Sequence, residues 1–426
     1  MKHAMDHPIT PAFLLRFTLP SIVMMIVLSM YTVVDGTLVS HLVGTEAFSA
    51  INVVYPILGV VVALGTMFGT GTTAIVSRKL GQGDQKGANE IFSFVLSVTI
   101  VIGIAFAALV LIFLRSIIRM LGANDVLFPY CYGYAFPVVC FLPMSMLQIQ
   151  FQTLIVAAGK PQIGLILTVG SGIVNVVLDL VFMGIFGWGI SGAAIATGIG
   201  FCIPAIFGLC YFRFYSKAAF RLVRPTRNWK QLAHAAANGS SEMVSYLSES
   251  VTTFLFNITM MRLLGQDGVA AVAIVLYLDF VLVAVSLGYA MGVAPLISYN
   301  YGKEDKANIR KIFRLSVLLC LCVGVCMTLG TRLFGGTLAT VFTPAGSAVY
   351  VLAVEGLRCY GLSYLCKGCN LFVSALFTAF GNGRVSAFLS FLRTLFFLSG
   401  SIILMAALFG VTGVWFAAPI AEGLAL

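Results

Sequence analysis

The sequence has little charge for its length. Only 9% of its 426 residues are Asp, Glu, Lys or Arg, whereas 60% are hydrophobic. Soluble globular proteins carry about a quarter of their residues as charged ones, because their surfaces must be covered with polar groups. The composition therefore excludes a soluble protein and predicts an integral membrane protein.

The sequence also lacks the motifs of several functional classes. Its four histidines form no zinc-ligand pattern, and no glycine-rich loop precedes a Lys-Ser or Lys-Thr pair, which argues against a zinc enzyme and an ATP-driven pump. The ten cysteines are scattered through apolar segments, and the single Cys-x-x-Cys, Cys366 to Cys369, has no second pair. We expect these thiols to fill apolar space rather than form disulfides or bind a metal.

Apolar runs of membrane-crossing length recur along the whole chain. A helix satisfies its own backbone hydrogen bonds in lipid, so the runs predict an all-α integral membrane bundle. The twelve predicted helices span 13–40, 47–77, 91–114, 128–158, 162–185 and 189–212, then 239–264, 269–299, 312–334, 347–380, 384–407 and 411–426. No cleavable signal peptide is indicated before the first helix. The last helix is shorter than its counterpart at 189–212, so we expect the native chain to extend further.

A basic linker separates the two sets of six helices. Residues 213–238 hold no acid and carry Arg213, Lys217, Arg221, Arg224, Arg227 and Lys230. The positive-inside rule places this linker in the cytoplasm, with both termini on the same side of the plasma membrane. The net charge of +10 follows from this topology and from anionic inner-leaflet lipid, so no nucleic-acid partner is predicted.

The two sets, residues 1–212 and 239–426, resemble each other. Gly71, Gly81 and Asp84 recur as Gly292, Gly302 and Asp305, always 221 residues later (302 minus 81). Six helices per set is an even number, so the repeats are parallel and related by an axis along the membrane normal. The predicted architecture is two pseudo-symmetric lobes with a central cleft that opens alternately to either side, as in a secondary transporter.

The repeat breaks at a few polar positions. With the same spacing, Asp35 corresponds to Phe256, Asp179 to Gly400 and Thr197 to Ala418, so only the first lobe is polar there. A charged residue in the membrane centre costs about 2.5–3.5 kcal/mol and needs a partner.

Four oxygen-bearing side chains of the first lobe are predicted to form one cluster: Asp35, Asn175, Asp179 and Thr197. Asn175 and Asp179 are one helical turn apart, as are Ala193 and Thr197. Oxygen ligands, with a backbone carbonyl near Ala193, suit a hard cation such as Na⁺. Two adjacent carboxylates suit a shared proton equally well. The alternative is that each polar residue is separately paired within the bundle.

Several stretches together resemble the multidrug and toxic compound extrusion family, across nearly the whole chain. They are FTLPSIVMM with Pro20, VDG with Asp35, NVVLDLVF, GISGAAIATG, the basic linker, and ALFTAFGNGRVSAFLSFLR near residue 375. The resemblance implies two V-shaped six-helix lobes and an antiporter, not an enzyme, that exports cationic lipophilic compounds in exchange for Na⁺ or H⁺. It assigns the coupling site to Asp35, Asn175, Asp179, Ala193 and Thr197, with no cofactor beyond the coupling ion, and implies a monomer.

Pro20 has two interpretations. A proline inside a helix frees a backbone carbonyl and kinks the helix. The resemblance adds a second role, a hinge at which the first helix bends during transport. The sequence favours neither.

Other candidates for the substrate cleft are Tyr31, Glu242, Tyr246, Glu249 and Asp279. Glu242 alternatively caps a helix start. Glu355 and Arg358, three residues apart, are predicted to neutralise each other. An alternative function is a lipid-linked oligosaccharide flippase, which needs cleft cations for a pyrophosphate. Few intramembrane ones are present: Arg358, Lys367 and Arg393.

Overall fold

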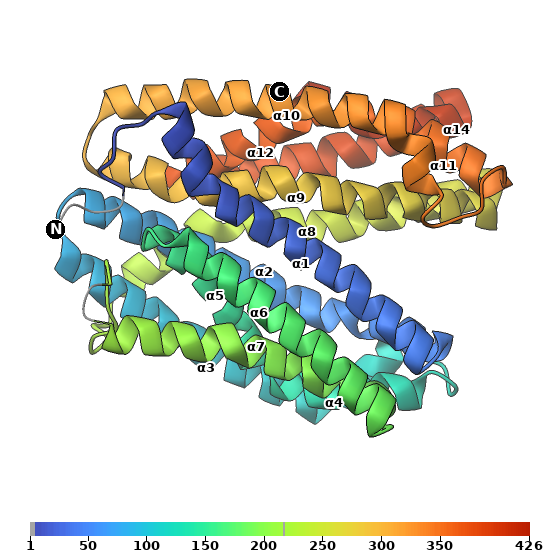
Figure 1. Cartoon of the computed structure of the whole chain (residues 1–426), viewed down its shortest axis with the longest axis horizontal. Helices are drawn as coiled ribbons and strands as arrows, with labels where there is room; N and C mark the ends of the chain where they lie inside the picture. The colour runs from blue at the N-terminus through green and yellow to red at the C-terminus, as the bar shows by residue number, and fades with distance from the viewer. Residues whose placement is uncertain (1–4, 216–217) are drawn as a thin grey trace.

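The computed structural model describes residues 5–215 and 218–426, apart from the side chain of Thr45. Lys217 of the predicted linker lies outside the described residues. Every regular element in the described part of the chain is helical. Figure 1 shows the helices running roughly parallel to the long axis of the molecule in two groups.

The first group forms the N-terminal lobe. Its elements are α1 (Pro11–Leu42), α2 (Thr45–Gly81), α3 (Gln85–Met120), α4 (Phe128–Cys140), α5 (Leu142–Ala157), α6 (Pro161–Asp179), a π-helical turn (Leu180–Ile185) and α7 (Gly189–Phe214). The predicted 128–158 helix is broken at Phe141, where α4 and α5 meet at an angle of 59°. Pro143 at the start of α5 has no N–H for the preceding turn, which explains the break.

The second group forms the C-terminal lobe. Its elements are α8 (Trp229–Leu264), α9 (Gln266–Gly302), α10 (Lys306–Ala339), α11 (Ala348–Tyr360), a 3₁₀ turn (Gly361–Ser363), α12 (Tyr364–Ala379), α13 (Gly383–Ser390), a π-helical turn (Phe391–Phe397) and α14 (Leu398–Ala425). α8 begins ten residues before its predicted start at 239, so residues 229–238 of the predicted linker are helical. Asn228 caps this start by accepting a hydrogen bond from the Gln231 N–H at 3.2 Å.

The described residues contain the twelve predicted helices. Nine helical stretches are long and apolar enough to cross a membrane, and the bent α4–α5 pair makes a tenth. Gly410, at φ 59° and ψ −134°, divides the last stretch into two. These make eleven, and α8, which is more polar, is the twelfth helix. α3 and α10 start earlier than predicted because Asp84 and Asp305, which are equivalent in the repeat, cap polar first turns that the apolar runs do not include.

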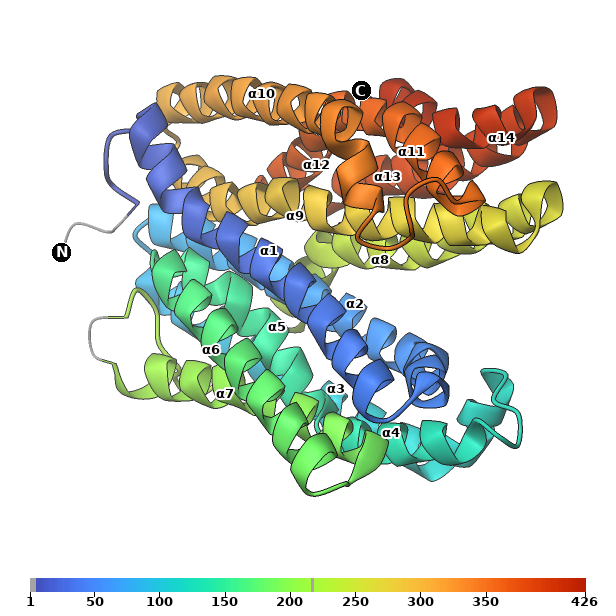
Figure 2. The ribbon, with the colours of Figure 1, turned by 45° about the vertical axis from the view of Figure 1, so that its right-hand side comes forward.

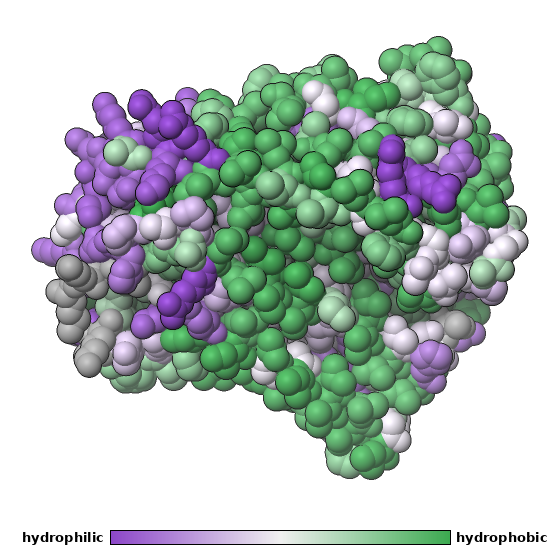
Figure 3. Space-filling view, turned by 45° about the horizontal axis from the view of Figure 1, so that its top comes forward, coloured by the Kyte–Doolittle hydropathy of each residue, from purple (hydrophilic) through white to green (hydrophobic). Residues whose placement is uncertain are grey.

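The two lobes meet at one end of the molecule. Figures 1 and 2 show their helices close together at the end that carries the N terminus and diverging toward the other end, which gives the predicted V shape. We call the closed end the linker side, because the loops after α2 and α7 lie together there: Gln85 Nε2 donates to the Ala219 carbonyl at 3.1 Å. Hydrophilic residues gather on the linker side in Figure 3, and hydrophobic ones cover most of the remaining surface.

Glycines form the contact between the lobes on the linker side. A Cβ on Gly71 of α2 would overlap the Ala235 carbonyl of α8, and one on Gly239 would overlap the Met67 carbonyl. Near the helix ends Gly81 likewise lies against the Tyr299 carbonyl, and Gly302 against the Arg78 carbonyl. Positions 78 and 81 are equivalent to 299 and 302 in the repeat. The repeated glycines thus form a pseudo-two-fold contact in which the helix backbones touch.

α1 belongs to both lobes. Its first half packs against α9, where Thr18 and Ser21 lie beside Gly292 and Gly288. Its second half packs against α6, where Tyr31 contacts Gly172. Figure 1 shows α1 crossing the molecule diagonally. Pro20 is buried within α1, close to the point where the helix passes from one lobe to the other.

We expect Gly239→Ala to lower the thermal unfolding temperature of the purified protein, because the new methyl group overlaps the Met67 carbonyl across the lobe contact. Overpacking of this kind costs about 1–3 kcal/mol. The matched control is Gly330→Ala in α10, where no atom lies within 4 Å of the added Cβ, and it should leave the unfolding temperature unchanged or raise it. Equal unfolding temperatures for the two variants would contradict a tight glycine contact.

Candidate functional site

Helices from three parts of the N-terminal lobe bring together the predicted cluster. Asp35 comes from the second half of α1, Asn175 and Asp179 from the last turns of α6, and Thr197 from α7. Asn175, Asp179 and Thr197 are 1%, 0% and 6% exposed, and Asp35 is half-buried. The Asn175 amide lies 3.4 Å from the Thr197 hydroxyl oxygen, to which it donates.

Small residues on α7 allow this close approach. A Cβ added to Gly200 would lie only 3.5 Å from Asn175 Cβ. Gly192 lies against Phe182 of the π-helical turn. Ala193 is buried one turn before Thr197. Asp179 is the last residue of α6, directly before the π-helical turn. Such turns are rare and frequently occur at functional sites.

The carboxylates of the cluster lack hydrogen-bond donors. Among the described residues, no donor reaches Asp35 Oδ1, either Asp179 oxygen or the Asn175 side-chain oxygen, although all are buried. Asp35 and Asp179 nevertheless lie close enough to interact directly through their carboxyl groups. An ionised carboxylate only accepts hydrogen bonds, so two facing carboxylates need a proton or a cation between them.

Two tyrosines complete the cluster. Tyr31 of α1, which the sequence suggested weakly, and Tyr134 of α4, which it did not, both interact with the Thr197 side chain and with both carboxylates. Tyr134 is 3% exposed, and Tyr31 is half-buried. The sequence carries no signal for Tyr134, because an aromatic residue in a membrane helix is usual and its partners come from other helices.

The C-terminal lobe is apolar at the equivalent positions. Phe256 and Ala418, which correspond to Asp35 and Thr197, are each 3% exposed and belong to the apolar core of that lobe. The scaffold is therefore repeated, whereas the polar cluster is not.

The C-terminal lobe has its own buried ion pairs at other positions. Lys367 of α12 lies 2.7 Å from Asp279 Oδ2, and the Tyr360 hydroxyl donates to the same oxygen at 3.2 Å. Asp279 was a predicted cleft residue, but it is 9% exposed and held in this ion pair. A second pair joins Arg393 Nε to Glu422 Oε1 at 3.6 Å, and the Asn370 amide donates to Glu422 Oε2 at 2.7 Å.

The other predicted cleft residues lie on α8, between the lobes. The Tyr246 hydroxyl lies near Thr66 of α2, in the opposite lobe. Glu249 is exposed and interacts with Tyr55 of α2 as well as with Lys367 in its own lobe. Glu242, half-buried, is attracted to Arg393. It lies well inside α8, which begins at Trp229, so the helix-start interpretation of Glu242 is wrong.

A family model matches the chain twice, over residues 20–181 and 243–403. The two matched segments lie in the two lobes and together cover most of the chain. The chain belongs to the MatE family. This is a family of transporters and not of enzymes. The first match contains Pro20 and three members of the cluster, Asp35, Asn175 and Asp179.

Curated MatE relatives match along nearly the whole chain. A multidrug export protein MepA of Staphylococcus saprophyticus subsp. saprophyticus is 24% identical over 417 residues, which cover 96% of this chain and 90% of the relative. A MepA of Staphylococcus aureus is 25% identical over 430 residues, which cover 97% of this chain and 92% of the relative.

Solved structures show the same fold. A crystal structure of MATE in complex with MaL6 superposes with a TM-score of 0.94 at 22% identity and covers 100% of this chain and 96% of its own. An outward-facing conformation of a multidrug resistance MATE family transporter superposes with a TM-score of 0.91 at 22% identity and covers 97% and 92%. The predicted all-α fold of two six-helix lobes is confirmed.

We expect Tyr134→Phe to weaken cation binding at the cluster, the role predicted from the sequence, by about 5-fold, since one buried hydroxyl contributes about 1 kcal/mol. The measurement is the cation concentration that gives half-maximal efflux of a fluorescent organic cation. Tyr130→Phe removes a hydroxyl from the same helix and should leave that concentration unchanged. Equal values for both variants would exclude Tyr134 from the cluster.

Proposed function

We propose that the protein is a secondary antiporter that exports cationic, lipophilic organic compounds in exchange for Na⁺ or H⁺. The observation that carries the proposal is the facing pair Asp35 and Asp179, whose buried oxygens find no donor among the described residues. MatE membership and the names of the MepA relatives support multidrug export as the activity.

The coupling follows from what the cluster does with and without its cation. When the cation leaves, two carboxylates face each other in a low-dielectric site and repel, so the lobe that holds them is strained. A cation or proton that enters removes this repulsion and draws α1 toward α6. Binding drives a conformational change only through a difference in affinity between the two states, and the Asp35–Asp179 separation is the geometry that sets this difference.

α1 transmits the change to the other lobe. Its second half carries Asp35 and its first half packs against α9, so a shift of Asp35 acts on the lobe contact. When the lobes separate on the linker side and close at the opposite end, the V opens toward the linker side instead. This motion alternately exposes the space between α2 and α8, where Glu249 and Tyr246 offer a charge and an aromatic ring to an organic cation.

The orientation in the membrane is part of the proposal. Lys and Arg on the linker side include Arg78, Lys79, Lys86, Lys303 and Lys306, which favours the cytoplasm for this side and for both termini. The lobes then diverge toward the outside of the plasma membrane. The protein acts as a monomer in this proposal, with small organic cations and membrane lipid as its partners.

A flippase for lipid-linked oligosaccharides is less well supported. A pyrophosphate needs free cations in the cleft, but Lys367 and Arg393 are committed to Asp279 and Glu422. Neither residue is therefore free to bind a pyrophosphate.

Asp179→Asn should abolish gradient-driven efflux, because it removes one of the two charges that hold the cation. The measurement is export of a fluorescent organic cation by protein in liposomes, under a sodium gradient and a proton gradient imposed separately. Transport driven by sodium alone identifies a sodium site, and transport driven by pH alone identifies a shared proton. Asp125→Asn, the same change at an exposed acid of the same lobe, is the control and should transport normally. Active efflux by Asp179→Asn would rule out the assignment.

Pro20→Ala should slow efflux several-fold without preventing folding. Alanine restores the backbone N–H at this position and stiffens α1 near its crossing between the lobes. The initial rate of efflux is compared with that of Pro204→Ala, a proline buried inside α7, which stays within one lobe. Normal rates for Pro20→Ala, with a slower Pro204→Ala, would remove the hinge role from α1.

A further inference from the structure

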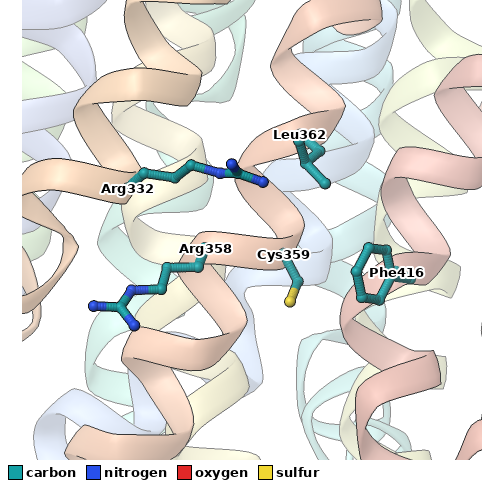
Figure 4. Close-up of a pocket in the computed structure, with 5 residues that line it drawn as sticks. All are labelled: Arg332, Arg358, Cys359, Leu362 and Phe416. Carbon is teal, nitrogen blue, oxygen red and sulfur yellow. The ribbon is translucent and has the colours of Figure 1, made fainter.

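Two arginines lie on the outer surface of the C-terminal lobe, away from the site described above. Arg332 of α10 and Arg358 of α11 are both exposed, and they line a cavity of about 300 Å³ together with Cys359, Leu362 and Phe416. In Figure 4 Arg332 extends from α10 toward the helix that carries Arg358, and Arg358 extends in the opposite direction. We call this cavity the arginine groove.

The arginine groove lies in the half of the C-terminal lobe that is opposite the linker side. At a rise of 1.5 Å per residue, Arg332 is roughly 10 Å from the end of α10 at Ala339, and Arg358 is roughly 15 Å from the start of α11 at Ala348. Phe416 is roughly 9 Å along the helix from the break at Gly410. All three helix ends are opposite the linker side.

Neither arginine has a protein counter-ion within the described part of the chain. The ion pairs there join other residues, and the predicted neutralisation of Arg358 by Glu355 is wrong. Glu355 is exposed on α11, and both it and Arg332 act electrostatically on Cys359. The groove therefore carries two positive charges, and the charges in and beside it sum to +1 when Glu355 is included. A cation on a lipid-facing surface is costly without a partner.

We propose that the arginine groove binds the phosphate of an anionic phospholipid from the leaflet opposite the linker side. A guanidinium presents two parallel N–H donors to phosphate oxygens, so the Arg332 guanidinium, which extends toward the helix of Cys359 and Leu362 (Figure 4), holds the phosphate. Arg358, at the edge of the groove, adds a second positive charge. Leu362 and Phe416 provide apolar surface for the glycerol and the first acyl carbons. The net positive charge selects an anionic headgroup over a zwitterionic one.

A lipid is favoured over free phosphate by the apolar wall of the groove. Free phosphate must lose its hydration shell to reach arginines flanked by Leu362, Phe416 and hydrocarbon. A phospholipid brings its phosphate to a lipid-facing surface without that cost, and its chains cover the neighbouring apolar side chains.

The test uses the whole purified chain and Arg332→Gln/Arg358→Gln. Bound phosphatidylglycerol is counted by native mass spectrometry over a titration, with phosphatidylcholine in parallel. Loss of two cations should weaken phosphatidylglycerol binding roughly 30-fold and leave phosphatidylcholine binding unchanged. Arg115→Gln/Arg262→Gln removes the same charge from exposed positions at the same end of the molecule and should bind as the wild type does.

A second variant tests the sign of the effect. Glu355→Gln raises the net charge of the groove and should strengthen phosphatidylglycerol binding about 5-fold. Equal phosphatidylglycerol affinity in the wild type and the double arginine variant would overturn the proposal. So would displacement of the lipid by inorganic phosphate at the same concentration, because the groove would then be a site for the free ion.

Discussion

Two carboxylates inside one apolar lobe are the constraint on which the rest of the structure depends. Asp35 and Asp179 come from different helices, and no donor among the described residues reaches their buried oxygens. A protein that only needed stability would place apolar side chains there, as the second lobe does with Phe256 and Ala418. In the mechanism we propose, a mobile cation or proton neutralises this charge and sets the distance between α1 and α6.

The repeat includes the glycine contact between the lobes but not the buried charged residues. Glycines at equivalent positions build the lobe contact from both halves, so the scaffold needs symmetry to close. The buried charges do not follow the symmetry. The first lobe holds two buried acids that have no counter-ion among the residues that the structure describes, whereas the second lobe pairs Asp279 with Lys367 and Glu422 with Arg393. In the mechanism we propose, the first lobe responds to the ion gradient, whereas the buried acids of the second lobe are paired within the protein.

Sequence patterns predicted the fold and most of the cluster, because membrane helices are long, regular and spaced by a strict repeat. Asp35, Asn175, Asp179 and Thr197 were predicted to converge from helical spacing and the broken repeat. Tyr134 was not, since its contact depends on how α4 packs, which no local pattern encodes. The pairing of Asp279 with Lys367 was missed for the same reason: 88 residues separate the partners. The sequence predicted the start of α8 ten residues too late, because its first turns do not belong to the apolar run.

The glycine contact also determines how abruptly the lobes separate. Interdigitated side chains must change rotamers and leave cavities when two surfaces part. Gly71 and Gly239 instead bring backbone against backbone, with no side chain of their own to rearrange. A gap of about 0.5–1 Å already removes roughly a quarter to a half of the dispersion attraction between two atoms. The lobe contact therefore weakens over a short separation, and its glycines can part without a change of rotamer.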